Sequence, residues 1–257
     1  MEVFLTPDAW IALLTLTFLE IVLGIDNIIF ISIVTGKLPA EKRKKATRIG
    51  LFLAMFMRIG LLMGISYLIA MKEPWFSLEL GWFNARFTGQ AIILLLGGIF
   101  LIYKSTKEIH EKVDHKGEEE KELKTSATKS FASVIVQILL IDLIFSVDSI
   151  LTAVGMTNGV TGALYIMVAA VIISVAVMML FAVPVGNFVN ANPSIQILGL
   201  SFLILIGFML ITESMHLSDA SLVGQHVGVV PKGYLYFAIA FSLVVEFLNM
   251  KMRKKGK

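Results

Sequence analysis

The chain has no cysteine and few charged residues. Among its 257 residues, Asp, Glu, Lys and Arg together make up 16%, and hydrophobic residues make up 57%. The absence of cysteine excludes disulfides and thiolate ligands, which leaves soft ions such as Cu(I) without an obvious protein site. Soluble proteins average about a quarter charged residues. The composition therefore predicts an all-α integral membrane protein with several spans.

The N-terminal segment has no lysine or arginine before Lys37. A cleavable signal peptide starts with basic residues and has a shorter apolar run than the one seen here. We therefore expect the first hydrophobic segment to be retained as a membrane span.

Seven segments are apolar over roughly the 20 residues that a membrane span needs. Lysines and arginines cluster after the first, third and seventh of them, and these places share one side of a seven-span protein. The positive-inside rule makes that side cytoplasmic, so we expect the N-terminus outside and the C-terminus inside. The predicted spans are residues 9–34, 48–71, 87–104, 131–156, 160–187, 194–212 and 232–250.

A short acidic pattern occurs twice inside these hydrophobic segments. In the first span, Glu20 is followed six residues later by Asp26 and then by Asn27. In the fourth span, Asp142 is followed at the same spacing by Asp148 and Ser149. Carboxylates are costly at the middle of a bilayer and are rarely placed there without a function. Two matched pairs of acids indicate a site for a cation.

The position of the two patterns predicts an inverted repeat. They begin two sets of three spans, and because three is odd, the two sets enter the membrane in opposite directions. The ends of the third and sixth spans are also similar, at residues 97–105 and 206–214. The expected segments are a first three-helix repeat (1–104), a charged cytoplasmic linker (105–130), a second repeat (131–212), an external loop (213–231) and a seventh helix with a basic tail (232–257).

Helix geometry places Glu20 and Asp142 near the centres of their spans. The second acid of each pattern lies ~9 Å further along and ~120° around an ideal helix. A local distortion at Gly24 or at Ser146 would let both acids of a pattern converge on one ion. Without such a distortion, they face different neighbours. In either case we expect Glu20 and Asp142 to form the central metal site. Metal ligands on the cytoplasmic side are then Asp26 and Asn27, and those on the external side are Asp148 and Ser149.

Carboxylate and amide oxygens suit hard ions such as Mn²⁺, Mg²⁺ or Ca²⁺. Clustered carboxylates in an apolar site cannot all stay ionised without a counter-charge, so an arriving divalent cation would displace protons. This reasoning predicts proton-coupled antiport of a metal ion. Arg58, near the middle of the second span, is the expected charge partner of one acid. The alternative is that Arg58 and the acids only hold helices together.

Other polar residues are weaker candidates, because an interhelical hydrogen bond or an exposed loop explains them as well. No nucleophile motif accompanies the acids, so we expect no enzymatic activity, and nothing indicates a nucleic-acid partner. These weaker candidates are Gln137, Glu213, His216 and Glu246.

Three stretches carry a specific resemblance. The first span reads FLEIVLGIDNIIFISIV, the fourth QILLIDLIFSVDSILTAVGM, and the end of the chain VPKGYLYFAIAFSLVVEFLN. The chain resembles the TerC family, in its short, membrane-only bacterial branch, over nearly its whole length. By this resemblance, Glu20, Asp26, Asn27, Asp142 and Asp148 are the family's intramembrane acidic positions, and Arg58 in MFMRIGLLMGI matches a family arginine.

The resemblance implies a multi-pass protein of the bacterial cytoplasmic (inner) membrane that takes part in ion homeostasis. It makes Mn²⁺ the leading ion for efflux, with other divalent cations such as Ca²⁺ left open, and it implies kinship with LysE-type exporters. Two other functions stay open. One is an accessory protein that supplies metal to exported proteins, with the secretion machinery or an exported enzyme as its partner. The other is a tellurium-resistance component, which an acid-lined path fits poorly.

Overall fold

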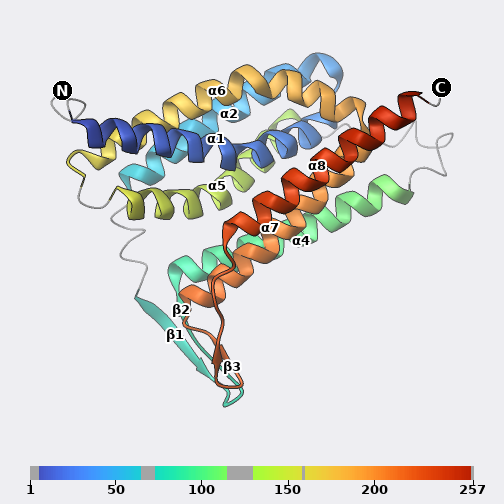
Figure 1. Cartoon of the computed structure of the whole chain (residues 1–257). Coiled ribbons are helices and arrows are strands. Elements are labelled where there is room, and N and C mark those ends of the chain that lie inside the picture. Colours follow the sequence, from blue (N-terminus) through green and yellow to red (C-terminus); the bar gives the residue numbers. More distant parts are fainter. Residues whose placement is uncertain (1–5, 65–72, 115–129, 158–159, 256–257) are drawn as a thin grey trace. The chain divides into compact units, whose positions relative to one another are not determined.

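The computed structural model describes residues 6–64, 73–114, 130–157 and 160–255, and it is mainly helical (Figure 1). Seven of the described helices are long and apolar enough to cross a membrane. Each overlaps one of the seven predicted spans, so the all-α membrane class is confirmed, although α2 ends at Met63 and not at the predicted residue 71. These helices are α1 (Pro7–Gly36), α2 (Ala40–Met63), α4 (Gly89–Asp114), α5 (Phe131–Met156), α6 (Ala163–Ala191), α7 (Pro193–Leu217) and α8 (Lys232–Lys255).

The two longest extensions beyond the predicted spans are those of α2 and α4, on the side rich in basic residues. Helix α2 begins at Ala40, eight residues before the predicted start at 48. Its first turns carry exposed side chains such as Lys44 and Lys45, which favour a helix as readily as apolar residues do. Helix α4 runs past residue 104 to Asp114, which confirms a helical start of the linker. The rest of the linker lies outside the described residues.

Local sequence explains where helices begin. Pro7 occupies the first turn of α1, where its missing N–H costs nothing, and the side chain of Thr6 accepts a hydrogen bond from the backbone N–H of Ala9 at 3.4 Å. Pro193 holds the equivalent position in α7, immediately after Asn192. Helix α6 ends at Ala191, so Asn192 alone connects it to α7.

The described helices belong to two compact units. In the first, α1 packs along α6, and α2 packs on α5 and α6. In the second, α4 packs along α7, and α8 lies against α7. Each unit therefore takes helices from both predicted three-helix halves. The two predicted halves are defined by their proposed symmetry, and they are not the two groups of helices that pack together. The inverted repeat stays a prediction.

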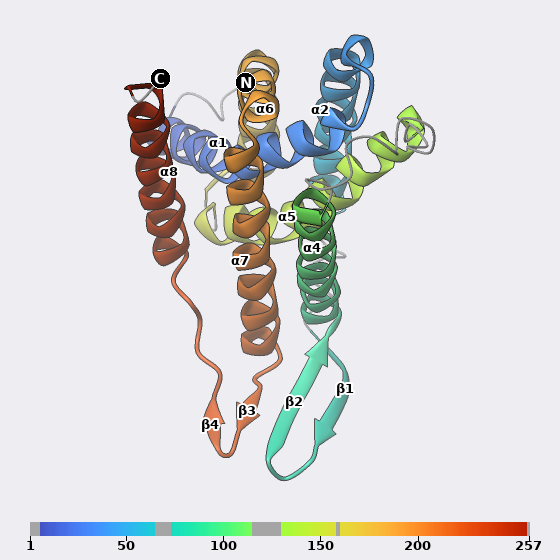
Figure 2. The same ribbon diagram turned by 90° about the vertical axis from the view of Figure 1, so that its right-hand side faces the viewer.

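A small antiparallel sheet in the second unit was not foreseen from the sequence. Strands β1 (Pro74–Glu79) and β2 (Phe83–Thr88) form a hairpin, and β3 (Ser221–Leu222) and β4 (Gln225–His226) continue the sheet in the order β1-β2-β3-β4. Figure 2 shows β2 leading into α4 while β3 follows α7. The two loops that were predicted to be external are therefore joined at one end of this unit.

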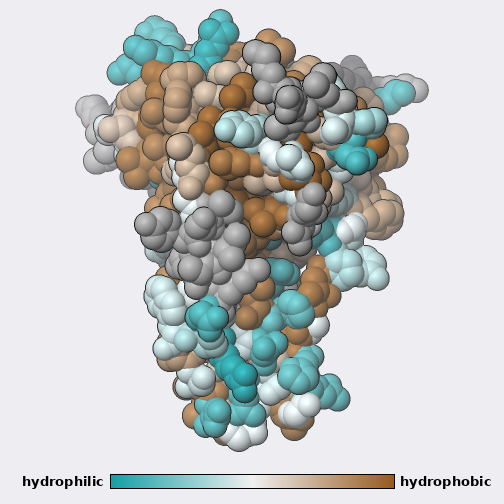
Figure 3. All heavy atoms as spheres, turned by 90° about the vertical axis from the view of Figure 1, so that its left-hand side faces the viewer, coloured by the Kyte–Doolittle hydropathy of each residue, from teal (hydrophilic) through white to brown (hydrophobic). Residues whose placement is uncertain are grey.

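Apolar side chains cover much of the helix surface, as a lipid environment requires. On α8, Phe237 is 71% exposed and Phe247 is 62% exposed. Figure 3 shows brown, hydrophobic residues over the helices, and teal and white residues among brown ones towards the foot of the view. The surface fits helices that contact acyl chains, with polar groups gathered at their ends.

Candidate functional site

Three charged side chains are buried together in the first unit. Glu20 on α1 is 6% exposed, Arg58 on α2 is 4% exposed, and Asp142 on α5 is 4% exposed. Charged groups are almost never buried to this degree unless they are paired. The three helices come from distant parts of the chain, so only the fold brings these residues into contact.

Arg58 bridges both acids, whereas the sequence predicted a pair with one of them. Its Nε donates to Asp142 Oδ2 at 3.1 Å, and its Nη2 donates to Asp142 Oδ1 at 2.5 Å. Its Nη1 donates to Glu20 Oε2 at 2.5 Å. The contact with Asp142 is a two-point fork, the geometry that a guanidinium offers to a carboxylate. The cluster holds two negative charges and one positive charge.

Asp142 has two further partners. The side-chain amide of Asn27 donates to Asp142 Oδ1 at 3.2 Å, and the hydroxyl of Ser146 lies 3.3 Å from Asp142 Oδ2. Both residues are almost completely buried. The sequence had singled out Ser146 as a point of helix distortion rather than as a partner of Asp142. Its position one turn after the acid was the available signal, since residues four apart share a helix face.

Regular helices produce this arrangement without any break. Helices α1 and α5 each run as one helix through Gly24 and Ser146, which agrees with the alternative that has no break. The Ser146 hydroxyl donates to the Asp142 backbone carbonyl at 2.6 Å, within the same turn. Gly24 serves close packing, because a Cβ there would overlap the sulfur of Met178 on α6.

A small cavity of about 10 Å³ adjoins the cluster on the side of Glu20. Apart from Glu20 it is lined by apolar side chains, among them Leu16, Leu62 and Met167. A buried water needs at least this much space and two to four polar partners. The cavity offers one carboxylate, which is fewer polar partners than a buried water or a hard cation needs.

The second acids of the two patterns differ from the first. The side chain of Asp26 lies outside the described residues. Asp148 is half-buried and lies ~120° around α5 from Asp142. Ser149 is 7% exposed and donates to the backbone carbonyl of Ser146 at 3.3 Å. The structure thus joins Glu20, Asn27 and Asp142 through Arg58 and direct hydrogen bonds. A metal role stays a prediction for all six residues.

The weaker candidates lie elsewhere. Gln137 donates to Ser133 Oγ at 3.2 Å on α5. In the second unit, Glu213 is half-buried near the end of α7, and Nδ1 of the exposed His216 lies 3.4 Å from the Val227 carbonyl oxygen. Glu246 is half-buried on α8. The described contacts give these residues local partners or partial burial, and they do not assign them a function.

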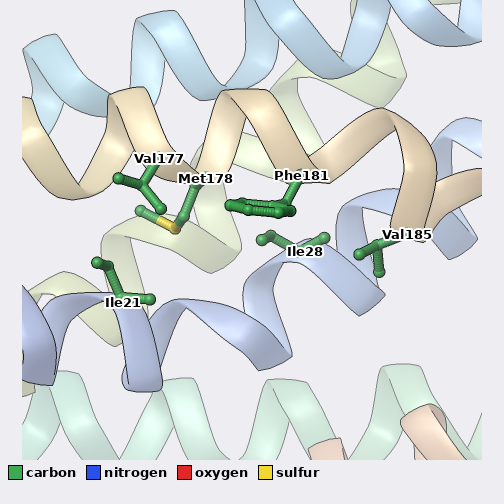
Figure 4. A pocket seen from close by; sticks show the side chains of 6 residues that line it. All are labelled: Ile21, Ile28, Val177, Met178, Phe181 and Val185. Atoms are coloured by element: carbon green, nitrogen blue, oxygen red, sulfur yellow. The ribbon is translucent and has the colours of Figure 1, made fainter.

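No cluster of three or more His, Cys, Asp or Glu side chains with metal-binding geometry occurs among the described residues. A larger pocket of about 180 Å³ lies between α1 and α6 (Figure 4), but its six lining residues are all apolar, with Met178 and Phe181 on α6 facing Ile21 and Ile28 on α1. That pocket has no group that binds an ion. The buried cluster around Arg58 is therefore the candidate site.

The fold and this site define the class: an α-helical integral membrane protein with seven candidate spans in its described part and a buried carboxylate–guanidinium cluster. The chain belongs to the TerC family. The model of this family, described as "Integral membrane protein TerC family", matches residues 5–256. The resemblance that the acidic motifs carried is confirmed.

Relatives cover the whole chain. It is 50% identical over 250 residues to "UPF0053 inner membrane protein YgdQ" of Escherichia coli strain K12, covering 97% of this chain and 96% of that protein. It is 45% identical over 251 residues to "UPF0053 protein" of Haemophilus influenzae, covering 98% and 97%. It is 43% identical to "UPF0053 inner membrane protein YoaE" of Escherichia coli strain K12, of which it spans 45%. No solved structure matches the chain.

Proposed function

We propose that this protein exports a divalent cation from the cytoplasm, with Mn²⁺ as the leading candidate and protons as the coupling ion. One observation carries the proposal: two carboxylates from α1 and α5 converge, buried, on a single guanidinium within membrane-spanning helices. Ionisable residues inside a membrane that face one another mark ion pathways more often than simple helix contacts.

The chemistry of the site favours hard cations. Its candidate ligands are carboxylate oxygens of Glu20 and Asp142 and the amide oxygen of Asn27, which suit Mn²⁺, Mg²⁺ or Ca²⁺. The chain has no cysteine, and this ligand set does not favour Zn²⁺. Protons bind the same carboxylates, so a proton and a metal ion compete for them. This competition is the physical basis of exchange.

The decisive experiment is Mn²⁺ flux in proteoliposomes with an imposed pH gradient. We expect gradient-dependent flux in the wild type and flux at the level of empty liposomes in Asp142→Asn and Glu20→Gln. Asp8→Asn is the matched control, because Asp8 is an exposed acid in the first turn of α1, and it should transport as the wild type does.

Normal flux in Asp142→Asn or Glu20→Gln would overturn the assignment of the site. Absence of flux in the wild type with Mn²⁺, Ca²⁺ and Zn²⁺ would overturn the transport function itself. The accessory role, in which the protein supplies metal to exported proteins, would then be tested by copurification with the secretion machinery and by the metal content of exported enzymes.

A further inference from the structure

The buried cluster contains its own cation. Arg58 is 4% exposed and touches both carboxylates. An arginine side chain stays protonated in proteins, so its positive charge is a fixed property of the site. The described residues add no third carboxylate or histidine to form a metal-binding group with Glu20 and Asp142. When both carboxylates are ionised, one divalent cation matches their two negative charges, and a guanidinium beside it leaves an excess of positive charge.

The guanidinium also occupies the oxygen atoms that an ion would need. It donates to both carboxylate oxygens of Asp142 and to Oε2 of Glu20, which are three of the four oxygens of the pair. A hard divalent cation binds carboxylate oxygens at about 2.0–2.6 Å. The three guanidinium nitrogens of Arg58 lie 2.5–3.1 Å from those oxygens, and they therefore occupy the positions where the ion would bind.

Space leads to the same conclusion. The cavity beside Glu20 has a volume of about 10 Å³, which is about the minimum for a single water. An ion that retains part of its hydration shell does not fit there while Arg58 holds its present position. The ion can enter the site only when the guanidinium moves away from the carboxylates.

We propose that Arg58 is a tethered competitor of the transported cation. The ion binds by displacing the guanidinium from Glu20 and Asp142, and the guanidinium returns when the ion leaves. Because Arg58 is attached to α2, it competes at a high effective concentration. It weakens ion binding and speeds release, and it offsets one of the two negative charges of the vacated carboxylates. This inference rests on the proposed function and specifies how the same site is regulated.

The test separates binding from turnover. Mn²⁺ binding to purified protein is measured from the electron paramagnetic resonance signal of free Mn²⁺, at alkaline pH where protons compete least. We expect Arg58→Gln to bind Mn²⁺ at least about tenfold more tightly, because no charge-assisted bonds need breaking first. In proteoliposomes the same variant should release the ion slowly and show a reduced maximal flux. If Arg58 had only a structural role, Arg58→Gln would weaken Mn²⁺ binding and flux together.

Two further variants complete the design. Arg58→Lys keeps the charge but loses the planar fork that reaches both acids, so we expect intermediate binding, about threefold tighter than the wild type. If Arg58→Gln does not fold, the Mn²⁺ affinity of Arg58→Lys tests the competitor role. Arg48→Gln is the matched control, because Arg48 is an exposed arginine on the same helix, and it should bind and transport Mn²⁺ as the wild type does.

The outcomes distinguish the two proposals. Equal or weaker Mn²⁺ binding by the folded Arg58 variants, with normal transport by the wild type, would overturn the competitor role and leave the transport function standing. Absence of binding in the wild type and in every folded Arg58 variant would overturn both. Tighter binding in the variants, together with slower flux, supports both.

Discussion

At the scale of single residues, the two central acids are held very differently. Asp142 accepts hydrogen bonds from Arg58 and Asn27 and lies within reach of the Ser146 hydroxyl. Glu20 accepts one from Arg58 and also lines the small cavity. A carboxylate with many donors is fixed in orientation, and one with fewer can reorient at lower cost. We therefore expect an incoming ion to bind Glu20 first and Asp142 second.

Asn27 provides a test at this scale. Its amide donates to Asp142 Oδ1 at 3.2 Å, and a typical hydrogen bond of this kind contributes about 0.5–1.5 kcal/mol. We expect Asn27→Ala to lower Mn²⁺ flux by roughly 2- to 12-fold without abolishing it, since both carboxylates remain. Asn187→Ala, at an exposed position on α6, should leave flux unchanged. Complete loss of flux in folded Asn27→Ala would contradict this prediction, because it would make Asn27 as essential to transport as the two carboxylates.

At the scale of elements, α4 and α7 approach through two glycines. A Cβ built on Gly98 would lie 2.5 Å from the carbonyl oxygen of Gly207 and 2.8 Å from Ile211, and one built on Gly207 would lie 2.8 Å from the carbonyl oxygen of Gly98 and 2.8 Å from Ile102. Small residues at such crossings let two backbones approach closely in membranes. The contacts of Gly98 and Gly207 mirror each other, as a local two-fold axis between the two glycines would require. The glycines lie in the two segments of similar sequence, residues 97–105 and 206–214.

The crossing predicts a specific sensitivity. A methyl group on Gly98 meets backbone atoms, which cannot move aside as a flexible side chain can, so Gly98→Ala forces α4 and α7 apart. We expect a loss of about 1–3 kcal/mol in stability, as for overpacked cores, measured as a lower melting temperature in detergent. Gly60→Ala is the matched control, because Gly60 lies within α2 with nothing inside 4 Å of its added Cβ. Unchanged stability in Gly98→Ala would contradict this packing.

At the scale of the whole molecule, the distribution of charge predicts how the chain is oriented in the membrane. The basic residues after the first, third and seventh spans predict a cytoplasmic C-terminus. The sheet formed by β1 to β4 then belongs to the opposite side, because β2 leads into α4 and β3 follows α7. Exposed aromatic side chains such as Trp75 and Trp82 at that end agree with an interfacial position.

The absence of cysteine allows a direct test of this orientation, because any introduced thiol is unique in the chain. Ser77→Cys places it on the exposed strand β1, and Lys44→Cys on the exposed start of α2. A membrane-impermeant maleimide should label Ser77→Cys in spheroplasts whose inner membrane is intact, and Lys44→Cys only after that membrane is permeabilised. The reverse pattern would invert the predicted topology.

The sequence by itself determined the membrane class and the seven spans, and it singled out Glu20 and Asp142, which the structure buries together. Membrane spans are readable because the bilayer imposes a length and an apolar composition on each segment separately. The spacing from Glu20 to Asn27 and from Asp142 to Ser149 was readable for a different reason, because a helix places positions seven apart on one face.

Only the tertiary structure decided which of these groups meet. Arg58 joins Glu20 and Asp142 through contacts between α1, α2 and α5, and no local pattern encodes how three helices rotate against one another. The sheet was missed because β2 and β3 pair across more than a hundred residues, and strand signals in short loops are weak. The Arg58 cluster and the sheet both depend on packing between segments that are distant in the sequence, and such contacts outweigh local preference.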